Sequence, residues 1–82
     1  MNNKLSLINH EGDCLWAVRN EVDEIVIYDQ WRSLVTTLTI PEFCSWIDGE
    51  FDITDSHDKP WNWNKEHKEA KPSMFKLLNF LK

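Results

Sequence analysis

The sequence predicts a small α+β domain, and two kinds of hydrophobic periodicity carry that prediction. Apolar residues alternate with polar ones within residues 14–29, and again within residues 51–63, which is typical of strands. Within residues 31–47 and 73–82 they recur three and four positions apart, as on one face of a helix. We therefore expect two antiparallel hairpins, joined in one sheet, with two short central helices and a C-terminal helix.

The length of the chain allows one domain, which we take as residues 1–82. A chain of this length buries roughly 60–65% of its unfolded surface, so it needs a rich core. Ten aromatic residues, five of them tryptophan, supply such a core, because each ring buries roughly 150–250 Å². No disulfide or metal is required for stability.

The first hairpin is predicted from "CLWAVRNEVDEIVIYD", residues 14–29. Two alternating runs flank the polar stretch "RNEVDE", the pattern of two strands and a turn. Both faces are apolar over part of their length, so we expect one face to be covered and the other partly covered. Residues 4–8, "KLSLI", alternate weakly and fit either a strand or a first helical turn.

Two short helices are predicted to meet at Thr39. Asp29 is a candidate N-cap for the first helix. Its apolar face comprises Trp31, Leu34, Val35 and Leu38. For the second helix, Thr39 and Glu42 have the spacing of a capping box, and Pro41 stands in the first turn, where proline is tolerated. Its apolar face comprises Ile40, Phe43, Cys44 and Ile47, and Gly49 follows as a helix stop.

The second hairpin is predicted from "EFDITD" and "PWNW", joined by the polar turn "SHDK". Pro60 restricts its second strand to an edge or a strand start. Residues 64–72 form a polar connector. Ser73 then caps a C-terminal helix over residues 73–82, which we expect to pack on the sheet.

Charge is divided unevenly along the chain. Residues 1–58 carry twelve acids and three basic residues, net −9, whereas residues 59–82 are net +4. An acidic body repels phosphate, so we expect no direct nucleic-acid binding. No apolar run reaches the ~20 residues of a membrane span, and the first residues lack the pattern of a signal peptide. Cys14 and Cys44 lie in apolar contexts typical of buried free thiols, so we expect a cytoplasmic protein without membrane contact.

Catalysis is poorly supported, and we expect no enzyme and no cofactor. His10, His57 and His67 all lie in polar stretches, and no serine has a nucleophile motif around it. Two glycines in the whole chain are too few for a phosphate-binding loop.

A metal site is also not expected. The one candidate group is Asp52, Asp55, His57 and Asp58. It lacks the internal glycine and the closing glutamate of a calcium loop. The alternative is structural: Asp52 lies on a solvated strand face, while Asp55 and Asp58 shape a turn by accepting backbone N–H groups.

The predicted function is non-enzymatic recognition of another protein, such as a basic enzyme or toxin that this protein inhibits or neutralises. The predicted acidic face comprises Asp48, Glu50, Asp52, Asp55 and Asp58, with no lysine or arginine between residues 42 and 58. Acidic residues accelerate association with a basic partner, and aromatic anchors supply binding energy. Trp61 and Trp63 are the candidate anchors, although a small domain more often buries tryptophans in its core.

Two alternatives remain open. Trp61 and Trp63 point to the same side of one predicted strand, so they could form a platform for a sugar or another small ligand. The C-terminal helix is apolar over a wide arc, so the protein could instead be a structural domain, either a monomer or a homodimer through that helix.

Overall fold

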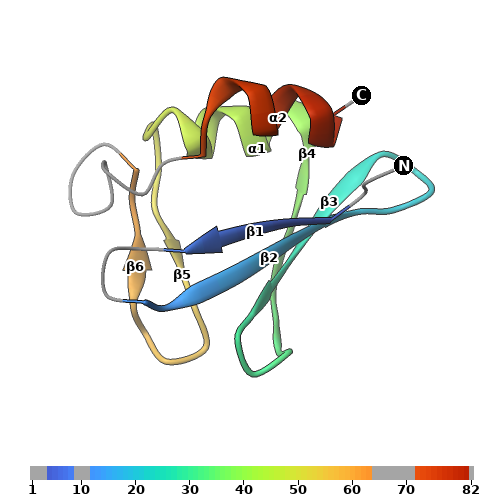
Figure 1. Ribbon diagram of the computed structural model, residues 1–82. Coiled ribbons are helices and arrows are strands. Elements are labelled where there is room, and N and C mark those ends of the chain that lie inside the picture. Colours follow the sequence, from blue (N-terminus) through green and yellow to red (C-terminus); the bar gives the residue numbers. More distant parts are fainter. Residues whose placement is uncertain (1–3, 9–11, 64–71, 82) are drawn as a thin grey trace.

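The computed structural model describes residues 4–8, 12–63 and 72–81 of the chain. Four antiparallel strands form one sheet, in the order β1-β2-β3-β4, and two helices lie over one face of it (Figure 1). The hairpin of β5 and β6 extends from the level of the helices past the end of β1 (Figure 1). The strands are β1 (Lys4–Ile8), β2 (Cys14–Arg19), β3 (Glu24–Asp29), β4 (Leu34–Thr39), β5 (Ile53–Thr54) and β6 (Pro60–Trp61); the helices are α1 (Ile40–Ile47) and α2 (Met74–Leu81).

The α+β class is therefore confirmed, but the sheet arrangement differs from the prediction. β5 and β6 form a two-stranded sheet of their own and do not extend the four-stranded sheet. All four strands of the larger sheet lie within residues 4–39. Among the described residues, the structure contains no apolar helix of membrane-spanning length.

The first hairpin and the strand character of residues 4–8 follow from one alternating pattern. β2 and β3 form the predicted antiparallel hairpin, in a register that runs from Leu15↔Asp29 to Arg19↔Ile25. β1 pairs with β2, so residues 4–8 are a strand and not a helical turn. The turn between β2 and β3 is closed by Asn20, whose Oδ1 accepts the N–H groups of Val22 and Glu24 at 3.0 and 2.9 Å.

The predicted helix over residues 31–38 is wrong, because Leu34–Thr39 is strand β4. The segment is rich in β-branched residues, which favour strands. A bulge opposite Ile27/Tyr28 interrupts the alternation, so Val35 and Leu38 both contact the core although they are three positions apart. This spacing imitates a helix. Asp29 caps a turn instead: its Oδ1 accepts the N–H groups of Trp31 and Ser33, each at 3.0 Å.

The second predicted central helix is confirmed as α1. The Glu42 N–H donates to Thr39 Oγ1 at 3.2 Å, and the Thr39 N–H donates to Glu42 Oε1 at 2.8 Å, which completes the capping box. After the helix, Gly49 adopts a φ of 83°, a conformation that favours glycine. The buried face of α1 differs from the predicted apolar face, because Trp46 points into the core.

This difference changes the environment of the cysteines. Cys44 is exposed on α1 and Cys14 is half-buried in β2, and both are free thiols. The prediction that both are buried is wrong for Cys44. The large Trp46 ring takes the place in the core that the smaller Cys44 side chain was expected to fill.

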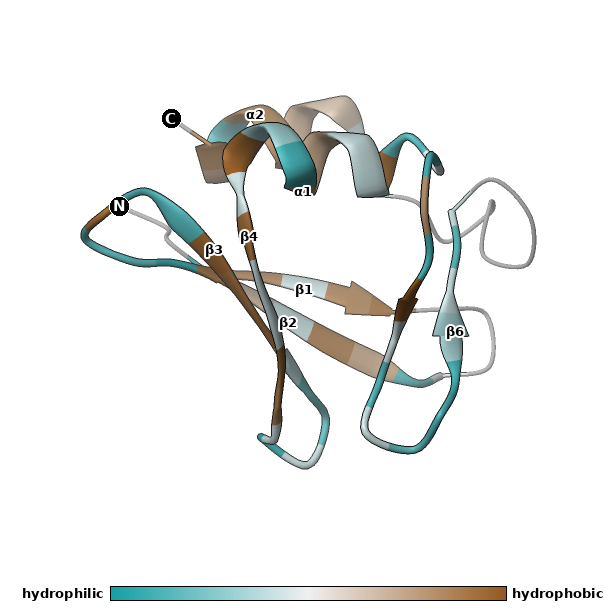
Figure 2. Cartoon of the chain, turned by 180° about the vertical axis from the view of Figure 1, so that it is seen from behind, coloured by the Kyte–Doolittle hydropathy of each residue, from teal (hydrophilic) through white to brown (hydrophobic). Residues whose placement is uncertain are grey.

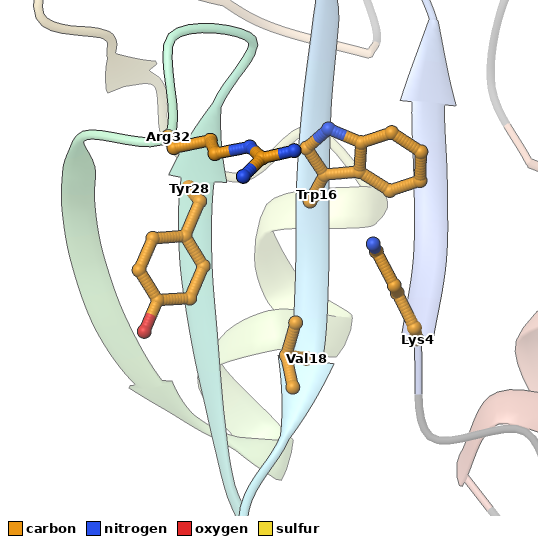
Figure 3. A pocket seen from close by; sticks show the side chains of 5 residues that line it. All are labelled: Lys4, Trp16, Val18, Tyr28 and Arg32. Atoms are coloured by element: carbon orange, nitrogen blue, oxygen red, sulfur yellow. The ribbon is translucent and has the colours of Figure 1, made fainter.

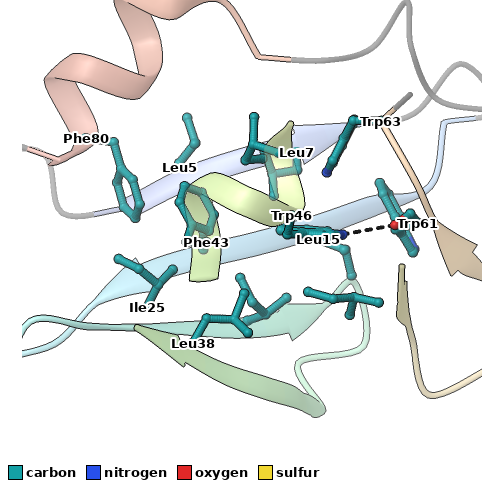
Figure 4. Packing of buried hydrophobic residues seen from close by; sticks show 14 residues of the cluster. Leu5, Leu7, Leu15, Ile25, Leu38, Phe43, Trp46, Trp61, Trp63 and Phe80 are labelled. Atoms are coloured by element: carbon teal, nitrogen blue, oxygen red, sulfur yellow. Dashed lines mark hydrogen bonds between the residues drawn. The ribbon is translucent and has the colours of Figure 1, made fainter. Parts of the chain in front are cut away.

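Aromatic side chains from three elements form the centre of the core (Figure 4). Trp46 of α1 lies 5.5 Å from Trp63, and Trp61 lies 5.7 Å from Trp63, measured between ring centroids. The indole Nε1 of Trp46 also donates to the Trp61 carbonyl oxygen at 2.9 Å. Phe43 packs between Trp46 and Phe80 of α2. These contacts hold the β5–β6 hairpin and α2 against α1.

The inward face of the sheet completes the core. Its buried side chains are Leu5, Leu7, Leu15, Ala17, Ile25, Ile27 and Leu38. Figure 2 shows hydrophobic segments along the strands and helices, and hydrophilic residues along the turn between β5 and β6. Trp61 and Trp63 are 1% and 0% exposed, so the expectation that they belong mainly to the core is confirmed.

The predicted C-terminal helix is confirmed as α2. Ser73 caps it by accepting the Lys76 N–H at its Oγ, at 3.2 Å. Phe80 reaches the core, whereas Met74, Phe75 and Leu78 are exposed. The polar connector predicted for residues 64–72 lies outside the described residues, apart from Pro72.

Candidate functional site

The five predicted acidic-face residues do not form one surface. Asp48, Glu50 and Asp52 are exposed in the segment that leads from α1 to β5. Asp58 is exposed in the turn at the far end of the β5–β6 hairpin, and Asp55 is buried. We call Asp48, Glu50, Phe51 and Asp52 the acidic patch.

The end of α1 adds to the negative potential of the acidic patch. A helix C-terminus carries about half a negative elementary charge. Asp48 is the C-cap residue of α1, and the last turn of the helix has no basic residue. An acid at this position costs stability, since the helix dipole favours a cation there. The patch is therefore more negative than its carboxylates alone would make it.

Phe51 gives the acidic patch an apolar contact point. Its side chain is 37% exposed and is flanked in sequence by Glu50 and Asp52. Asp52 is held by the buried Asn62, whose Nδ2 donates to Asp52 Oδ1. Trp61 and Trp63 do not offer such a contact, because both rings lie inside the core.

Asp55 belongs to the interior of the hairpin and not to the acidic face. Its Oδ1 accepts the N–H groups of His57 and Lys59, at 2.8 and 3.1 Å. Its Oδ2 accepts the indole N–H of Trp61 at 3.1 Å. The side chain is 6% exposed, so its charge stabilises the turn and is not presented at the surface. The structural alternative for Asp55, in which it shapes a turn through backbone N–H groups, is confirmed.

A second polar cluster joins two turns that are distant in sequence. Ser56 Oγ donates to Asp29 Oδ2, and the rings of Trp31 and His57 stack with their centroids 3.7 Å apart. Desolvation raises the pKa of Asp29, but hydrogen bonds from Ser56, Ser33 and Trp31 and the charge of His57 lower it by a larger amount. The pKa of Asp29 therefore lies below its ordinary value. This cluster fixes the turn between β3 and β4 against the β5–β6 hairpin.

The uncovered face of the four-stranded sheet carries a cleft that the sequence analysis did not identify (Figure 3). Its volume is about 330 Å³, and its lining is Lys4, Trp16, Val18, Tyr28 and Arg32. Trp16 and Tyr28 are direct neighbours across β2 and β3, and Lys4 Nζ lies 4.1 Å from the centre of the Trp16 ring. That Trp16 and Tyr28 share this face follows from the pairing of β2 with β3. Lys4 and Arg32 come from β1 and from a turn whose position depends on the fold.

Metal-binding groups are not brought together in the part of the chain that the structure describes: no cluster of three or more His, Cys, Asp or Glu side chains is arranged to hold an ion. Comparison of the chain with protein-family models, with curated proteins and with solved structures finds no match.

Substitution of Asp55 tests its structural role. The buried carboxylate of Asp55 accepts three hydrogen bonds. Asp55→Asn removes its negative charge, so we expect the free energy of unfolding to fall by about 1.5–3 kcal/mol. Asp58→Asn is the matched control: the residue is exposed with a φ of 61°, which asparagine tolerates, and we expect little change. Urea unfolding followed by circular dichroism measures both. Equal stability of the two variants would contradict the role of Asp55.

The lowered pKa of Asp29 predicts loss of stability in acid. Its folded pKa lies below the unfolded value, about 3.9, so its contribution is complete above the unfolded pKa and is lost as the pH falls through the folded pKa. Asp29→Asn should therefore be less stable than the wild type at neutral pH, with a smaller further loss on acidification below about pH 4. The urea midpoint, measured across this range, checks the prediction; parallel pH profiles would refute it.

Proposed function

We propose that this protein is a non-enzymatic binding protein that recognises a basic surface on another protein through the acidic patch. The observation that carries the proposal is Phe51, an exposed aromatic side chain flanked by Glu50 and Asp52 and close in sequence to Asp48, the C-cap residue of the α1 helix. Binding would cover part of the partner, so the protein would act by occlusion, as an inhibitor or neutraliser does, without a cofactor.

The two parts of the patch have separate energetic roles. The carboxylates and the helix end accelerate encounter with a basic partner, and this effect is weakened by salt. Phe51 supplies apolar area that leaves water on binding, the usual source of affinity at the centre of an interface. This arrangement replaces the anchors predicted from sequence, since Trp61 and Trp63 are buried.

The two alternative functions differ in their support. Burial of Trp61 and Trp63 leaves no exposed ring faces for the sugar platform. Self-association through α2 is supported by three exposed apolar side chains: Met74, Phe75 and Leu78 are 70%, 75% and 58% exposed. We rank it second because an apolar helix face does not by itself identify what covers it.

Paired substitutions test the acidic patch. Glu50→Lys/Phe51→Ser reverses one charge and removes the apolar anchor, whereas Glu21→Lys/Val22→Ser makes the same changes at an exposed site in the β2–β3 turn. The tagged wild-type protein first captures its partner from an extract of its host, and the purified partner is then titrated with each protein at low and at high salt. We expect the patch variant to bind at least about tenfold more weakly, or ~1.4 kcal/mol, with reduced salt dependence.

The control variant should bind as the wild type does. An unchanged affinity and salt dependence for the patch variant would contradict the proposal, as would an equal loss in the control. Asp55 is left intact in both proteins, because it stabilises the hairpin and its loss would confuse folding with binding.

A further inference from the structure

We propose that the cleft on the uncovered face of the sheet binds a small anion that contains an aromatic ring, with a mononucleotide as the representative ligand. The cleft lies on the side of the sheet away from the helices, whereas the acidic patch lies at the end of α1. The inference is thus independent of the proposed function, and the two sites have opposite charge.

The floor and walls of the cleft suit a flat ring. Val18 of β2 lies between Lys4 of β1 and Tyr28 of β3, with Trp16 and Arg32 at one end (Figure 3). Trp16 and Tyr28 form a cross-strand pair, whose Cβ atoms are about 4.5–5.5 Å apart. Exposed aromatic side chains on a sheet stack with nucleobases, and such stacking is worth about 1–3 kcal/mol per base.

The charges of the cleft suit an anion. Among the described residues that line it, Lys4 and Arg32 are cationic and none is acidic, although the whole protein has a net charge of −5. Arg32 presents a planar fork of N–H donors that matches phosphate or carboxylate oxygens. Its backbone has a φ of 65°, and its N–H donates to the Asp29 carbonyl oxygen at 3.0 Å, so the turn that carries Arg32 is fixed at the mouth of the cleft.

The size of the cleft and the surrounding charge favour a single nucleotide over a long strand. A volume of about 330 Å³ is at the lower end of the range for small-molecule sites, roughly 300–1,000 Å³. A longer polyanion would extend beyond Lys4 and Arg32 over an acidic protein, where repulsion opposes it. The acidic charge of the body still disfavours binding of a long nucleic acid, whereas the cleft is a local cationic site.

Titration with two probes tests the cleft. Adenosine monophosphate and a short oligothymidine are each titrated into the full-length protein by calorimetry, and the Trp16 indole is followed by NMR. The variants are Trp16→Leu, which removes the stacking ring, and Arg32→Gln, which removes the charge at the mouth. Lys76→Gln on α2 is the matched control for loss of a cation. Circular dichroism verifies that each variant is folded.

We expect adenosine monophosphate to bind and to shift the Trp16 indole signal. Binding should be lost in Trp16→Leu, weakened at least about fivefold in Arg32→Gln and unchanged in Lys76→Gln. Equal or weaker binding of oligothymidine supports a free nucleotide as the ligand, whereas tighter binding supports the same site acting on a nucleotide within a single strand. Failure of both probes to bind, or binding that folded Trp16→Leu and Arg32→Gln retain in full, overturns the inference and leaves the acidic-patch proposal unaffected.

Discussion

The packing of Trp46 against Trp61 and Trp63 is the interaction on which the rest of the structure depends. The β5–β6 hairpin has two residues in each strand and pairs with no strand of the larger sheet. An isolated hairpin of this length is not stable in water. It is held in place by buried indole rings, by the hydrogen bond from Trp46 Nε1 to the Trp61 carbonyl oxygen, and by Asp55, which accepts the Trp61 indole N–H.

This arrangement decides which residues are available for recognition. The hairpin tryptophans face inward, whereas Glu50 and Asp52, in the segment between α1 and β5, are exposed, with Phe51 partly exposed between them. The helices cover one face of the sheet only, and the other face therefore presents Trp16 and Tyr28 to solvent. One protein thus carries two surfaces of opposite character: an acidic one beside the helix end and a cationic, aromatic one on the sheet.

Features that depend on local chemistry were predicted correctly from the sequence, whereas features that depend on the pairing of strands were not. The capping box of Thr39 and Glu42 is local, and it correctly located α1. β4 was missed because a bulge gives Val35 and Leu38 the spacing of a helix, and a bulge is a property of two strands. Asp55 was assigned to the surface because its indole partner, six residues away, is apparent only in the folded hairpin.

The candidate sites show the same division. The acids and the absence of basic residues between positions 42 and 58 can be read directly from the sequence. The cleft cannot, because Lys4 meets Trp16 only through the register of β1 on β2, in which Lys4 stands opposite Val18. Arg32 reaches the cleft from a turn that was predicted to be helical.

Three of the five tryptophans lie inside the core, and two lie at the surface. Hydrogen exchange of the indole N–H groups, resolved by NMR, tests this distribution most directly. We expect slow exchange for Trp46, Trp61 and Trp63, which are buried, and fast exchange for Trp16 and Trp31, which are accessible. Exchange of Trp61 or Trp63 as fast as that of Trp31 would contradict their burial in the core.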